Sequence, residues 1–450
     1  MAYTVNRLGT WFGYVALAVV VFDHTHSAVA VAALLVAGQV LSAFLVPAVV
    51  ARVESSPRRG MLSGLYLFET AATAALVGVL EWHFSLPAIL LLVALDGTAA
   101  LAASALLRAA AASSAREWAY ASHPSHITPI AGADEAACED ESDGPRIDGR
   151  EAAAVESERS ANAALNIGFA TTFTLGPAIA GLVVPAFGAP AALLIDIASF
   201  LICGAMLLDL EPRTEEVETA SVRARVRAAW QYIGETQNLR RLLLAEGVAL
   251  TFFTFSGPVE VAYAKASLHA GDSGFGLLVG VWGLGSAIGS VVFARSLDRS
   301  LTALLSASTL AVGLAYLGWS AAPSLAVALP AGLLGGIGNG VQWASLISAV
   351  QRLTPQRLHG RLMGAVESLG AICPAVGFSL GGAIAAIGSP RVAFLVAGIG
   401  ATLSTTAFVR LPLAPAQFAR ANLEEIEQQP KARAMFGDPA PEQTPTGDLR

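Results

Sequence analysis

The residues best suited to chemistry in this sequence are carboxylic acids inside long apolar stretches. A charged side chain at the centre of a bilayer costs about 2.5 kcal/mol or more, so each acid is expected to face a partner or a water-filled cavity. A carboxyl group also exists in a charged and a neutral form, which is the property a proton carrier needs. The candidate proton carriers are Asp96, Glu246, Glu260, Asp23 and Glu69.

A structural hydrogen bond to a neighbouring helix is the alternative role for any of these acids. We favour that alternative for Asp196 and Glu367, because each lies one to two turns from a predicted membrane face. For Glu260 the competing explanation is an ion pair with Lys265.

Other chemistry finds no support in the sequence. There is no GxxxxGK[ST] phosphate loop, and the chain has only two lysines, Lys265 and Lys431. The glycines of "GVWGLGSAIG" lie in an apolar stretch, so they are better explained by helix packing than by a dinucleotide site. No GxSxG pattern occurs, and Cys138, Cys203 and Cys373 are scattered. We therefore expect no enzyme activity, no cofactor and no metal site.

The composition identifies the elements that must position the acids. The chain has 450 residues, of which 54% are hydrophobic and 14% charged, with a mean hydropathy of +0.60. A soluble domain usually has about 25% charged residues, so we predict an all-α polytopic membrane protein. The twelve predicted transmembrane helices are 8–22, 28–50, 61–80, 86–110, 162–184, 190–208, 242–263, 274–294, 302–320, 325–350, 362–386 and 392–411.

Arginine is concentrated in alternate loops, whereas the intervening "DHTHS" and "EWHFS" contain neither lysine nor arginine. The positive-inside rule places the arginine loops and both termini in the cytoplasm. No cleavable signal peptide or lipidation motif is recognisable at the start. We expect a multi-pass protein of the cell inner membrane.

The predicted spans divide into two bundles of six helices, 1–208 and 239–412. Between them, 209–238 forms a cytoplasmic linker with an amphipathic helix, and 413–450 forms a largely disordered cytoplasmic tail. The acidic loop 111–158 lacks apolar periodicity and is expected to be disordered.

The two bundles resemble each other in sequence. Residues 34–52 align without gaps on 277–295, with seven of nineteen positions identical. "GPAIAG" and "FGAPAALLID" in the first half similarly correspond to "CPAVGF" and "IGSPRVAFLV" in the second. Tandem repeats of this kind predict a substrate site at the interface of the halves. Chance similarity between apolar stretches is the alternative.

Several stretches together resemble the major facilitator superfamily, and within it bacterial drug and siderophore exporters of the macrolide-efflux and enterobactin-exporter type. They include "NRLGTWFGYVALAVVVFDHTHSAVAVAALL", "NLRRLLLAEGVAL", "LLIDIASFL" and "LISAVQRLTPQRLHGRLMG". The resemblance implies a central cavity lined by helices one, four, seven and ten. Besides the acids, it nominates the cavity residues Trp11, Tyr14, Phe253, Asn339, Gln342 and Trp343.

Two family motifs are present in altered form. Gly176, Pro177 and Gly181 are similar to the fifth-helix motif of drug/proton antiporters, with Ala180 at a usual glycine position. They are expected to shape the interface with the other half by bending the helix and admitting a close neighbour; an ordinary packing kink is the alternative. The cytoplasmic gate motif lacks its usual glycine and aspartate. Its candidate residues are Arg52, Glu54, Arg58, Arg59, Arg295, Asp298 and Arg299.

These features predict a monomeric secondary transporter that exports a small amphiphilic or hydrophobic molecule in exchange for protons. Its partners would be the substrate, protons and the lipid bilayer, with no nucleic acid. A proton symporter that imports a nutrient is one alternative. A non-transporting membrane scaffold that recruits a partner through the acidic loop is another.

Overall fold

The computed structural model describes residues 2–54, 60–122, 188–208, 231–296, 298–354, 359–411 and 413, with single positions between 156 and 187. Its described elements are helices, connected mostly by short turns. The acidic stretch from 123, the linker up to 230 and the tail from 414 lie outside the described residues.

The N-terminal half is built from long helices that run back and forth. Its elements are α1 (Ala2–Thr25), α2 (Ala28–Leu35), a π-helical segment η1 (Val36–Leu41), α3 (Ser42–Glu54), α4 (Met61–Trp82), α5 (Leu86–Ser122) and α7 (Ala189–Met206). Segments α2, η1 and α3 form one continuous path that the sequence predicts as a single span. Helix α1 packs on α7, and α4 packs on both α5 and α7.

The C-terminal half repeats this plan. Its elements are α9 (Gln237–Thr254), α10 (Ser256–Ala262), a second π-helical segment η2 (Tyr263–Ser267), α11 (Gly271–Ala294), α12 (Leu301–Ala321), α13 (Leu325–Arg352), α14 (His359–Ile387) and α15 (Pro390–Val409). Helix α13 packs between α11 and α12, and α12 packs on α15.

Ten helical stretches in the described residues are long and apolar enough to cross a membrane. The chain is therefore a multi-pass helical membrane protein, as the composition predicts. One boundary prediction is wrong. Helix α5 continues to Ser122, although we expected a loop from residue 111. The extension is rich in alanine, which has the highest helix propensity, so the helix continues past the apolar stretch.

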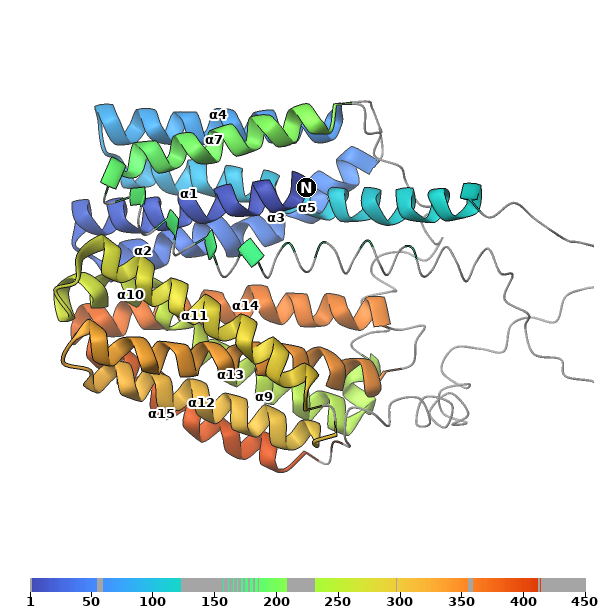
Figure 1. Cartoon of the computed structure of the whole chain (residues 1–450), viewed down its shortest axis with the longest axis vertical. Coiled ribbons are helices and arrows are strands. Elements are labelled where there is room, and N and C mark those ends of the chain that lie inside the picture. The colour runs from blue at the N-terminus through green and yellow to red at the C-terminus, as the bar shows by residue number, and fades with distance from the viewer. Residues whose placement is uncertain are drawn as a thin grey trace, which may run out of the picture.

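The two halves meet where α1 joins α2, and we call this region the joined end (Figure 1). Helix α14 packs against α2 and η1, and α10 packs against α1 and α2. The approach is close, because a Cβ added at Gly382 of α14 would lie 2.8 Å from the Cβ of Ala32. Further along the same path, α3 packs on α5 of its own half.

The C-terminal half has a dense aromatic core. Trp319 is completely buried, and its ring centroid lies 5.0 Å from Phe394 and 5.6 Å from Trp282. Tyr263 and Tyr316 pack on the same indole. The Trp319 Nε1 donates to the Ala328 carbonyl at 2.9 Å, so its polar atom is also satisfied. This core fixes α12, α13 and η2 together.

Candidate functional site

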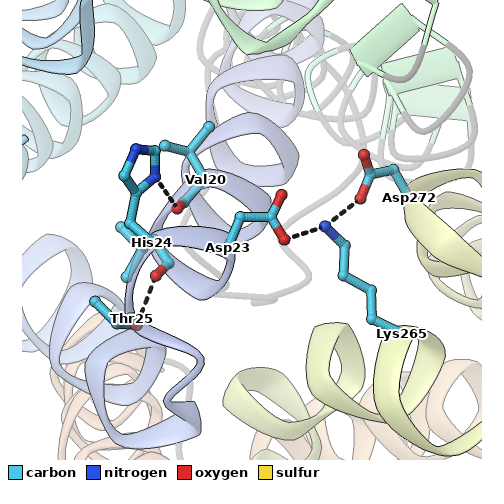
Figure 2. Close-up of polar contacts among 7 residues, drawn as sticks. Val20, Asp23, His24, Thr25, Lys265 and Asp272 are labelled. Atoms are coloured by element: carbon cyan, nitrogen blue, oxygen red, sulfur yellow. Dashed lines mark hydrogen bonds and ion pairs between the residues drawn. The ribbon is translucent and has the colours of Figure 1, made fainter.

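An ion bridge connects the halves at the joined end. Lys265 Nζ lies 2.6 Å from Asp23 Oδ1 at the end of α1 and 2.5 Å from Asp272 Oδ1 at the start of α11 (Figure 2). Asp23 belongs to the N-terminal half, and the other two residues belong to the C-terminal half. The structure thus places Asp23, a predicted proton carrier, in a contact between halves. Lys265 binds these two aspartates instead of Glu260.

Beside this bridge, Glu260 of α10 faces the N-terminal half. Its half-buried carboxyl interacts electrostatically with the hydroxyls of Tyr14 and Tyr316 and with Ser256 on its own helix. Tyr14 is on α1, and its ring meets Trp11 edge-on with centroids 5.5 Å apart. Three predicted residues from both halves, Trp11, Tyr14 and Glu260, therefore gather into one site of aromatic and acidic character.

The N-terminal half contains three acids that are close enough to influence one another. Glu69 of α4 is 0% exposed and interacts electrostatically with Asp96 of α5 and Asp196 of α7. Asp96 accepts a long hydrogen bond from Thr73 Oγ1 at 3.4 Å. Neither oxygen of Glu69 has a hydrogen-bond partner, although Asn6 lies near it, and Asp196 Oδ1 is also unpartnered.

The buried acid of the C-terminal half has hydrogen-bond partners. Glu246 of α9 is 3% exposed, and its Oε2 accepts a hydrogen bond from Gln342 Nε2 of α13 at 2.7 Å. The Gln342 Oε1 in turn accepts from Ser308 Oγ and from Thr309 Oγ1, both on α12. Three helices thus share one polar chain, which makes Glu246 and Gln342 parts of the packing between α9, α12 and α13.

The remaining predicted cavity residues do not form one group. Asn339 Nδ2 donates to Ser286 Oγ of α11 at 3.3 Å. Phe253 is buried, and its backbone carbonyl accepts from the Tyr316 hydroxyl at 2.7 Å. Trp343 is 53% exposed. Asn339 and Phe253 are thus involved in packing within the C-terminal half.

Gly176 has a different neighbour from the one we expected. A Cβ at this position would lie within 2.5 to 2.8 Å of Trp11, which is on α1 of the same half. The small residue therefore makes room for the Trp11 indole, and through it supports the Trp11 and Tyr14 pair. Pro177 and Gly181 lie outside the described residues.

Most of the predicted gate cannot be located. The side chains of Arg52, Glu54, Arg58 and Arg59, and that of Glu367, lie outside the described residues. Arg295, Asp298 and Arg299 are exposed at the end of α11 and in the turn after it.

Sequence analysis did not single out Asp272, and it did not predict the contact of Asp196 with α1. Asp272 is separated from Asp23 by most of the N-terminal half, so no local pattern links them. The rarity of lysine was the available signal, since a lone cation near a membrane face needs an acidic partner. For Asp196, the "GTWFG" spacing of Gly9 and Gly13 was a signal that α1 presents a flat face to a neighbour.

Comparisons with known proteins identify the type of fold. Residues 242–440 match the family model described as Major Facilitator Superfamily. No protein of curated function matches the sequence. The family model covers less than half of the chain, and for the first half the comparison is with solved structures.

Three solved structures illustrate the likeness. The nucleoside transporter NupG has a TM-score of 0.68 at 10% identity, over 91% of this chain and 98% of that chain. A bacterial homologue of the iron transporter ferroportin, in an inward-facing state, has a TM-score of 0.63 at 16% identity, over 91% of this chain and 96% of that chain. An inward-facing bacterial homologue of the human lysosomal transporter Spinster has a TM-score of 0.58 at 12% identity, over 95% and 98% respectively. The chain has the fold of major facilitator transporters.

Proposed function

We propose that the chain is a twelve-helix member of the major facilitator superfamily that exports a small amphiphilic cation across the cell inner membrane in exchange for protons. The two halves rock about the site between them, as transporters built from tandem repeats do. The joined end faces outward, because the arginine-rich loops lie at the opposite end of the helices. The structure then corresponds to an inward-facing state.

The observation that carries this proposal is the position of Glu260. Its carboxyl lies on the C-terminal half but faces Tyr14 of the N-terminal half, at the boundary that must open and close. The nearby ammonium of Lys265 is engaged by Asp23 and Asp272. Glu260 is therefore left to interact with a ligand that enters between the halves.

The surroundings of Glu260 suit a cation that also has an apolar part. Trp11 and Tyr14 offer aromatic faces and edges, and aromatic faces attract cations by about 0.5–2 kcal/mol. A carboxylate beside them supplies the opposite charge. Substrate and proton would then compete for the same carboxyl: a proton from outside releases the cation, and loss of that proton inside restores affinity.

Transport in inverted membrane vesicles tests this proposal. The vesicles are loaded to impose a pH gradient, and uptake of the lipophilic cation tetraphenylphosphonium and of cationic dyes is followed together with the gradient. We expect gradient-driven accumulation, with the gradient dissipating faster when the cation is present. Glu260→Gln should abolish accumulation, because an amide neither balances the cation nor exchanges a proton.

Glu235→Gln is the matched control, since Glu235 is an exposed glutamate of the same half. It should transport as the unmodified protein does. Uptake only in right-side-out vesicles, with a symported proton, would replace the exporter by an importer. If no probe moved and deletion of residues 123–155 removed the cellular activity, the scaffold alternative would replace transport altogether.

A further inference from the structure

Glu69 is a buried acid that the proposed exchange at Glu260 does not use. It is completely enclosed among α1, α4, α5 and α7, and both of its carboxyl oxygens lack a hydrogen-bond partner. Leaving a buried polar group unsatisfied costs about 1–3 kcal/mol, and more when the group is charged. A buried group of this kind requires an explanation beyond packing, because a hydrophobic residue would fit the same space without that cost.

Asp196 has a similar environment on the opposite side of the same cluster. It is 5% exposed, and its Oδ1 has no hydrogen-bond partner. Its carboxyl lies flat against α1. A Cβ at Gly9 would be 2.7 Å from Oδ1, and a Cβ at Gly13 would be 2.6 Å from Oδ2. Any side chain larger than glycine at these two positions would collide with the acid, so α1 is shaped to receive it.

Among the described residues, the groups found to interact with these two acids are acidic or uncharged. From α5 comes Asp96, which interacts electrostatically with both, and from α7 comes the Cys203 thiol, which interacts with Glu69. Helix α1 contributes the uncharged Asn6, and α7 contributes the Ser199 hydroxyl. Like charges in a shared buried site repel one another, which disfavours ionisation of all of them at once.

A metal ion is a poorer occupant than a proton. Among the described residues, no group of three His, Cys, Asp or Glu side chains is arranged to hold a metal ion. A bound cation also needs several oxygen ligands around one point. A proton needs only one carboxyl oxygen, which both Glu69 and Asp196 offer.

We propose that Glu69 and Asp196 form a proton-binding site within the N-terminal half, separate from Glu260 and covered by the Gly9 and Gly13 face of α1. Helix α1 also contains Trp11, Tyr14 and Asp23. Binding or loss of a proton at Glu69 or Asp196 would therefore affect, through α1, the site around Glu260 and the ion bridge. The inference deepens the proposed proton exchange and rests on it for the use of the proton, but proton binding itself does not require transport.

Infrared spectroscopy of the full chain in liposomes tests the site without any substrate. Protonated carboxyl groups have a distinct carbonyl band that shifts in D2O. We expect a band that disappears as the pH rises and that titrates identically in sodium and choline buffers. Glu69→Gln and Asp196→Asn should each remove part of it. Glu81→Gln, at the exposed end of the same helix as Glu69, and Asp298→Asn should leave it unchanged.

Two results would overturn the proposal. One is a titrating band that both Glu69→Gln and Asp196→Asn leave intact, or no such band at all. The other is a titration of the unmodified protein that sodium displaces, which would make this a cation site. The sodium comparison needs no variant, so it decides the question even if a variant fails to fold. Failure of this proposal would leave the proposed exchange at Glu260 untouched, because the infrared experiment tests Glu69 and Asp196 and the vesicle experiment tests Glu260.

Discussion

The two halves differ in the hydrogen bonding of their buried acids. In the C-terminal half, Glu246 is held by Gln342, which is itself held by two hydroxyls of a third helix. In the N-terminal half, Glu69 and Asp196 are similarly buried, but both carboxyl oxygens of Glu69 and one of Asp196 have no hydrogen-bond partner. A satisfied polar chain makes packing rigid and specific, whereas an unsatisfied acid at membrane depth indicates function. The comparison supports a structural role for Glu246 and the proton-binding role that we propose for the N-terminal acids.

The largest loss of stability is expected from a substitution in the aromatic core of the C-terminal half. Trp319→Ala removes a completely buried ring that packs on four others, and such truncations cost about 3–5 kcal/mol. We expect a large fall in the thermal unfolding temperature in detergent. Trp82→Ala is the control, because Trp82 is 90% exposed, and it should unfold almost as the unmodified protein does. Equal losses in the two variants would contradict a rigid C-terminal core.

The polar chain around Glu246 gives the next largest effect. Gln342→Ala deprives Glu246 of its donor, at about 1–3 kcal/mol for an unsatisfied buried group. The two α12 hydroxyls that donate to Gln342 lose one acceptor but still donate to the Leu305 carbonyl. Thermal unfolding should again shift downward. Gln39→Ala, at an exposed glutamine of η1, is the matched control. An unchanged midpoint for Gln342→Ala would mean that Glu246 is not held structurally.

The ion bridge at the joined end should have a modest effect. Lys265→Met removes the links to Asp23 and Asp272, and partly exposed ion pairs contribute about 0.2–1 kcal/mol. We expect the population open at the joined end to rise by up to about fivefold, since 1.4 kcal/mol corresponds to tenfold. Distances between spin labels on α1 and α11 measure this change. Lys265→Arg should keep the distance between the labels that is measured in the unmodified protein. The same distance distribution in both variants would show that the ion bridge does not hold the joined end closed.

The smallest stability effect is expected at Glu69, despite its complete burial. Glu69→Gln removes no hydrogen bond, so unfolding should change by less than about 1 kcal/mol, the typical net value of one bond. Thermal unfolding beside Gln342→Ala measures the contrast directly. A loss at Glu69 as large as that at Gln342 would show that the two acids are held in the same way.

Composition and hydropathy predicted that the chain is a multi-pass helical membrane protein. The predicted boundaries were wrong where a helix continues beyond its apolar segment. The alanine-rich stretch after residue 110 extends α5 beyond the apolar segment, and the π-helical segments η1 and η2 leave no pattern in a run of apolar residues. Both π-segments adjoin the contact between halves, where such irregularities often mark functional sites.

The acids were predicted as candidates from their types and positions, but their partners were not predicted. Hydropathy places Glu246 and Glu69 in the same class, and only the packing of helices distant in sequence separates them. Gln342 lies 96 residues from Glu246, and Asp23 lies 242 residues from Lys265. The contact of Asp196 with the glycines of α1 was not predicted either, because distance from a membrane face gives no information about the face of a neighbouring helix.

The central claim is that transport requires proton binding by the N-terminal acids in addition to the proton exchanged at Glu260. Proteoliposomes that contain Glu69→Gln, Glu81→Gln or the unmodified chain allow two modes to be compared with tetraphenylphosphonium: exchange at equal pH and accumulation driven by a pH gradient. We predict that Glu69→Gln retains exchange but loses gradient-driven accumulation, whereas Glu81→Gln retains both. Full gradient-driven accumulation by Glu69→Gln would contradict the claim and leave proton exchange to Glu260 alone.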